Sequence, residues 1–146
     1  MSNPGPAITV GLHPQNVTSS QALRLLAKVQ GINANVAGDN VAQVINSSNF
    51  TVKEVFFTNA NNAGASANLS DTIAIVRTGA AGTGSNVCVS TTLTNCATNA
   101  GVQDASDAIT TSFANVTNLY VRVTTASANT GTVDCYVYGY DFSQAQ

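Results

Sequence analysis

Near its carboxyl end, this sequence of 146 residues alternates apolar and larger polar or aromatic side chains with a period of two. A period of two is that of a β-strand, whose successive side chains point to opposite faces of a sheet. Two such strands are expected, over residues 119–124 and 131–142. Further candidate strands precede them at intervals of about 10–15 residues, with no helical pattern between them; they lie at residues 41–45, 50–57, 72–78 and 87–93. The pattern predicts a mainly β domain, an antiparallel sandwich or barrel.

The last expected strand carries a row of three tyrosines, Tyr136, Tyr138 and Tyr140, at every second position. Val133, Cys135 and Val137 occupy the opposite face of the same strand. One interpretation is that the tyrosine side is the core and the valines turn to a second packed layer. The other is that the tyrosines form an oligomer interface, because tyrosine suits positions that are apolar at one end and wet at the other.

The first 17 residues contain all the prolines of the chain, Pro4, Pro6 and Pro14. Proline fixes φ and removes a backbone donor, so an extended arm is expected here. The arm is either a frayed terminus or a segment that lies on a partner surface, and His13 belongs to it. The start has no basic residues followed by an apolar run, so no secretory signal is expected, and the protein is expected to fold in a reducing cytoplasm.

Residues 18–30 are the one helix candidate. A Thr or Ser at 18–20 would cap it, the apolar residues recur at helical spacing, and Gly31 follows as a stop. We therefore predict an arm and short helix over residues 1–38, followed by a β domain over 39–146. The helix is expected either to cover its own domain or to contact a neighbouring subunit or shell through Leu23, Leu26 and Val29.

Composition excludes several function classes. Charged residues make up only 8% of the chain, with five basic and seven acidic side chains, which is too few basic groups to follow a phosphate backbone. No apolar run approaches the 18 residues of a membrane span. Asp104 and Asp107 stand three apart but lack the spacing of an EF-hand and are expected to cap a turn. We find no pattern for a catalytic residue, a metal site or a cofactor, and expect no enzyme.

The three cysteines are expected to be reduced and partly buried, in keeping with a cytoplasmic protein. Their number leaves at least one thiol unpaired. A bond between Cys88 and Cys96 across a hairpin is the alternative. With one histidine in the chain and no Cys-x-x-Cys pair, a structural zinc site is not expected.

The β region resembles the small β-sandwich head decoration, or cement, proteins of tailed bacteriophages. The resemblance rests on four segments in order, the last two being the most specific: residues 39–44 (DNVAQV), 50–60 (FTVKEVFFTNA), 118–125 (NLYVRVTT) and 133–141 (VDCYVYGYD). It implies a jelly-roll-like sandwich, a non-enzymatic structural role, homotrimers, and binding to the major capsid protein on the virion surface after synthesis in the bacterial cytoplasm. It does not account for residues 1–38. A receptor-binding or fibre-tip domain and a carbohydrate-binding module remain the alternatives.

Overall fold

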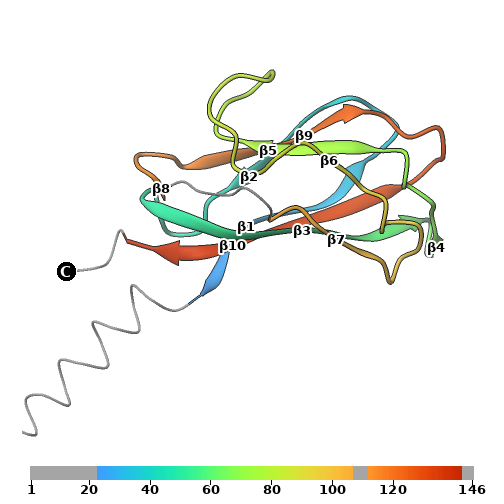
Figure 1. Cartoon of the computed structure of the whole chain (residues 1–146), viewed down its shortest axis with the longest axis horizontal. Coiled ribbons are helices and arrows are strands. Elements are labelled where there is room, and N and C mark those ends of the chain that lie inside the picture. The colour runs from blue at the N-terminus through green and yellow to red at the C-terminus, as the bar shows by residue number, and fades with distance from the viewer. Residues whose placement is uncertain (1–22, 107–111, 143–146) are drawn as a thin grey trace, which may run out of the picture.

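The computed structural model describes residues 23–106 and 112–142. This part of the chain is mainly β, with two antiparallel sheets that lie one above the other (Figure 1). The strands are β1 (Arg24–Asn33), β2 (Gly38–Gln43), β3 (Phe50–Asn62), β4 (Ala65–Ser66), β5 (Ile73–Arg77), β6 (Thr91–Thr92), β7 (Val102–Asp104), β8 (Ser112–Phe113), β9 (Asn118–Thr125) and β10 (Thr132–Asp141).

The larger sheet, sheet A, has the order β1-β10-β3-β4, and the short strands β7 and β8 also pair with β3. The smaller, sheet B, has the order β2-β9-β5-β6. Every pairing between these strands is antiparallel. The long strands β3 and β10 therefore form the centre of sheet A, and β9 is central in sheet B.

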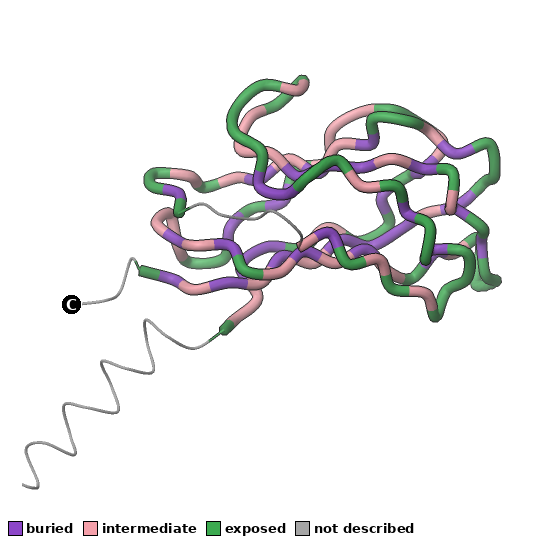
Figure 2. Tube along the Cα trace, viewed as in Figure 1, coloured by how far each residue is buried: buried purple, intermediate pink, exposed green. Residues whose placement is uncertain are grey.

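One hydrophobic core fills the space between the sheets. Buried and less buried residues alternate along the strands, as Figure 2 shows for both layers. Its large, fully buried side chains come from both sheets and include Phe50, Val55 and Phe57 of β3 and Val76, Leu119 and Val121 of β5 and β9. Burial of such side chains contributes about 1.5–3 kcal/mol each, so the facing apolar sides of the two sheets supply much of the driving force of the fold.

The helix predicted over residues 18–30 is wrong for the residues that the structure describes, because β1 begins at Arg24. β1 pairs with β10 from Arg24–Gly139 to Asn33–Thr132. The pairing shifts register twice, between Leu25 and Ala27 and between Val29 and Ile32. These irregularities break the period of two that would have marked a strand, and pairing with β10 outweighs the weak helical preference of the leucines.

The boundary expected between residues 38 and 39 does not separate β1 from the fold, since β1 is an integral strand of sheet A. Gly31 was expected to stop a helix. It has a φ of +70° and lies in the second irregularity of β1, where its N–H donates to Asp134 Oδ1 at 2.8 Å. The glycine therefore serves a bulge in a strand.

Candidate interaction surface

The tyrosine row lies on the outer face of sheet A. The valine side of β10 is the core side, because Val133, Cys135 and Val137 are at most 1% exposed. Tyr136, Tyr138 and Tyr140 alternate with buried neighbours and are partly exposed. The interpretation in which the tyrosines themselves form the core is therefore excluded.

Two apolar side chains from the neighbouring strands extend the row on the same face. Phe56 of β3 is the cross-strand partner of Tyr136, and its ring lies 6.3 Å from that of Tyr138 at an interplanar angle of 63°, an edge-to-face contact. Leu25 of β1 is the cross-strand partner of Tyr138. We call this set, Leu25, Phe56, Tyr136, Tyr138 and Tyr140, the tyrosine face.

Polar side chains of the same strands lie beside the tyrosines. Lys28 pairs with Tyr136 and Glu54 with Tyr138. The Tyr136 hydroxyl accepts a hydrogen bond from Gln30 Nε2 at 3.0 Å. Aromatic side chains are enriched at protein–protein interfaces, which makes the tyrosine face the main candidate for an interaction surface.

Two carboxylates of β10 are buried in sheet A, and each has a hydrogen-bond or ion-pair partner on a neighbouring strand. Asp134 is 6% exposed and, besides Gly31, accepts from Asn59 Nδ2 at 2.9 Å. Asp141 is 2% exposed and lies 3.2 Å from an Arg24 guanidinium nitrogen. These bonds tie β10 to β1 and β3 at the two ends of the tyrosine face and hold its backbone in register.

Of the residues predicted to anchor the chain to a shell, the three that the structure describes do not form one surface. Leu23 is 46% exposed, Leu26 is fully buried, and Val29 packs partly buried against the core. The expectation that Leu26 contacts a partner is wrong, because a strand sends it into the core. The other predicted contacts, Pro4, Pro6, His13 and Pro14, lie outside the described residues.

Sequence reasoning missed that side chains of sheet B hold the loop containing Ala81 and Gly82 in place over its outer face. Asp39 of β2 pairs with Arg122 of β9 at 3.0 Å and accepts from the Ala81 N–H at 2.5 Å. Arg77 donates to the Gly82 carbonyl at 2.6 Å. Burial of the Asp39 carboxyl raises its pKa, but these hydrogen bonds and the two arginine charges outweigh it and lower the pKa below 3.8 overall. The arginines thus hold a loop in place.

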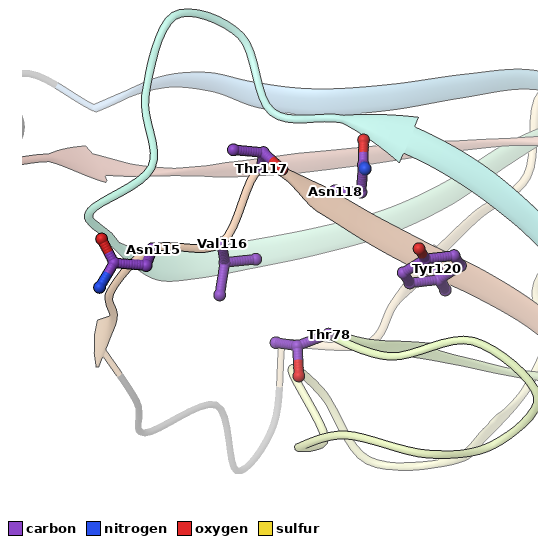
Figure 3. A pocket seen from close by; sticks show the side chains of 6 residues that line it. All are labelled: Thr78, Asn115, Val116, Thr117, Asn118 and Tyr120. Carbon is purple, nitrogen blue, oxygen red and sulfur yellow. The ribbon is translucent and has the colours of Figure 1, made fainter.

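Two hollows on the described surface are small. One, of about 180 Å³, lies beside the first residues of β9 (Figure 3) and is lined by Thr78, Asn115, Val116, Thr117, Asn118 and Tyr120. A second, of about 230 Å³, is lined largely by asparagines, including Asn33, Asn35 and Asn61. The Asn35 amide donates to the carbonyls of Ser127 and Asn129 and accepts from the Gly131 N–H, so it serves the local loops.

The chemistry-bearing side chains are dispersed or buried. Within residues 23–106 and 112–142, no group of three or more His, Cys, Asp or Glu residues is placed to hold a metal ion. The three cysteines are free thiols in the core. Burial raises the pKa of Cys88 and of Cys96 to about 11, so neither is poised as a nucleophile. Asp104, the last residue of β7, accepts from the Ser106 N–H at 2.8 Å, while Asp107 lies outside the described residues.

Among the described residues, no helix has the length and apolarity that a membrane span requires. Comparisons of the chain with protein-family models, with curated proteins and with solved structures found no match.

Proposed function

We propose that this chain is a structural virion protein, a head decoration or cement protein that binds the outside of a phage capsid and stabilises it. The observation that carries the proposal is the tyrosine face, a row of aromatic side chains left partly exposed on the outer face of sheet A. Two facing antiparallel sheets also fit the jelly-roll-like β-sandwich that the resemblance implies, and that finer topology is part of the proposal.

Self-association through the tyrosine face follows from the same observation. Soluble assemblies favour closed symmetry, and we propose a homotrimer. Tyrosine is enriched among the residues that dominate interface energies, because it buries a large area with little loss of side-chain freedom. The low charge of the chain, 8% of residues, limits repulsion between copies packed closely on a shell.

The trimer is tested by light scattering over a concentration series, which should give three times the chain mass of 14.9 kDa. Tyr136→Ser and Tyr138→Ser together should weaken the assembly by at least tenfold, since each removes an interface aromatic. Val89→Ser is the control, because Val89 is an exposed apolar residue outside the strands. A wild-type monomer at all concentrations, or equal effects of both variants, would contradict the interface.

Capsid binding is tested by co-sedimentation with shells of the major capsid protein from the same virion. The wild-type chain should sediment with the shells, and shells that carry it should withstand higher temperature. Absence of co-sedimentation at micromolar concentration would overturn the decoration role.

A carbohydrate-binding module is the second candidate, because a partly exposed aromatic row also suits stacking against sugar rings. Retention of the isolated domain on a polysaccharide array, lost in the Tyr136→Ser and Tyr138→Ser variant, would favour that function over decoration. A receptor-binding or fibre-tip domain would give binding to host cells instead.

A further inference from the structure

Among the strands that the structure describes, β2 is the unprotected edge. Sheets expose unpaired backbone groups at their edge strands, and proteins protect such edges by shortness, lysine, proline or bulges. β1, the edge of sheet A, carries Lys28 and two register shifts. The other edge strands are short: β4, β6 and β8 have two residues each and β7 has three. β2 has six residues, no lysine, no proline and an unbroken register with β9.

The hydrogen bonds around β2 identify which backbone groups are free. The Val44 N–H donates to the Thr117 carbonyl at 2.9 Å, on the β9 side, and the Ile45 N–H donates to the Leu26 carbonyl at 2.7 Å, on the opposite side. Because these directions alternate along a strand, the amides and carbonyls of Asp39, Val41 and Gln43 point away from β9. No strand of the described part of the chain pairs with them.

Apolar side chains are exposed along the same stretch. Val36, just before β2, is 60% exposed, Val41 in its middle is 58% exposed, and Ile45, just after it, is 40% exposed. The one charged side chain of β2, Asp39, is already paired with Arg122. The edge therefore offers backbone donors and acceptors, three apolar side chains and little uncompensated charge.

We propose that β2 pairs with β2 of a second copy, antiparallel and across a two-fold axis at Val41. This register is complementary to itself, since Val41 meets Val41 and the Asp39 carboxylate meets the Gln43 amide of the other copy. No like charges oppose each other. Val36 of each copy comes near Ile45 of the other, so all three exposed apolar side chains find apolar neighbours. The three free residues of each strand supply roughly six main-chain hydrogen bonds.

The two-fold contact joins two copies of sheet B into one continuous sheet. It lies on the opposite sheet from the tyrosine face and does not depend on the proposed function. A contact between two short strands buries little area and is weak in dilute solution, but it strengthens where copies are held close together. On a shell it would link neighbouring copies sideways.

Disulfide trapping tests both the contact and its register. Val41→Cys should form a covalent dimer under mild oxidation, because opposed residues at a hydrogen-bonded position lie about 5.5 Å apart at Cα. The native cysteines do not compete, since each is at most 2% exposed. Val89→Cys, 41% exposed in its parent side chain, is the control and should remain largely monomeric.

A mixture of Asp39→Cys and Gln43→Cys chains, one of them enlarged by a tag, should give the mixed dimer. Each variant alone should give little, because its two thiols would be about 13–14 Å apart along the strands. Equal rates for Val41→Cys and Val89→Cys would overturn the contact, including the case in which another segment or partner covers β2. Faster dimerisation of Asp39→Cys alone than of the mixture would overturn the antiparallel register. Loss of trimers or of capsid binding would leave both results unchanged, so the two proposals fail separately.

Discussion

Replacing Leu26 by alanine separates the strand observed at residues 24–33 from a helix that presents Leu23, Leu26 and Val29 on one face. Leu26 is fully buried, and its Cδ1 lies 2.7 Å from where a Cβ on Gly139 would stand, so it fills the space above that glycine. Leu23, three residues earlier, is 46% exposed. The two leucines should therefore contribute very differently to the free energy of unfolding if this segment is a strand, and similarly if it is a helix.

The expected magnitudes follow from burial. Removing the buried part of Leu26 loses about 2 kcal/mol of transfer free energy, and the cavity left behind raises the total cost to about 2–5 kcal/mol. Leu23→Ala removes a half-exposed side chain and should cost less than about 1 kcal/mol. For a chain of this length, a loss of 3 kcal/mol lowers Tm by about 6–12 °C.

Urea and thermal unfolding followed by circular dichroism measure both variants against the wild-type chain. If Leu26→Ala does not fold, Leu26→Val provides a milder variant with the same ranking, and it should still destabilise more than Leu23→Ala. Equal losses for Leu23 and Leu26, or an insensitive Leu26, would refute the placement of β1 in sheet A.

Three further outcomes are expected. Ala63 adopts a φ of +50° in the two-residue turn that it forms with Gly64. Ala63→Asn creates the Asn-Gly sequence that such turns favour, so it should raise the free energy of unfolding by about 0.5–1 kcal/mol. An unchanged or lower urea midpoint would contradict this. Hydrogen bonds from the Ser127 hydroxyl and the Ala128 N–H lower the pKa of Asp71 below 3.8. The contribution of the ionised Asp71 to stability is therefore present above pH 3.8 and is lost as the pH falls through the lower pKa of the folded state. The stability of Asp71→Asn should accordingly depend less on pH in the acid range than that of the wild type. Burial raises the pKa of Cys88 and Cys96 from 9.0 to about 11, so the free energy of unfolding should fall as the pH rises from 9 toward 11. Alkylation at pH 8 should label these thiols only at the rate of unfolding, and rapid labelling of the folded protein would show that they are accessible.

The parts of the fold that sequence predicted are the regular ones. β9 and β10 appear where strict alternation placed them, because their side chains divide cleanly between core and surface. β3 was expected to end at Phe57 but continues to Asn62. Its last residues are mostly asparagine, alanine and threonine, a composition typical of a loop. Their pairing with β4, β7 and β10 makes them a strand, and that pairing is a tertiary effect.

β1 shows the second limit of sequence reasoning. Leu25, Leu26 and Ala27 form a short apolar run that fits a helix or a strand equally well. The register shifts that let Ala27 and Val29 both meet β10 remove the alternation that would have decided between them. The contact predicted for Leu26 failed with the helix, since a strand sends Leu26 into the core and leaves Leu23 at the surface.

The orientation of β10 could not be decided from its own sequence, because its valine side and its tyrosine side both carry side chains that suit a core. Its partners decide it. On the valine side, Val137 pairs with Val55 and Cys135 with Phe57, all fully buried. On the tyrosine side, the neighbouring strands bring Lys28 and Glu54 opposite the rings. A lysine and a glutamate of different strands cannot enter a core at low cost, whereas a tyrosine tolerates partial exposure. The charges on β1 and β3 thus turn the tyrosines outward, and an aromatic row remains at the surface, where another molecule is able to contact it.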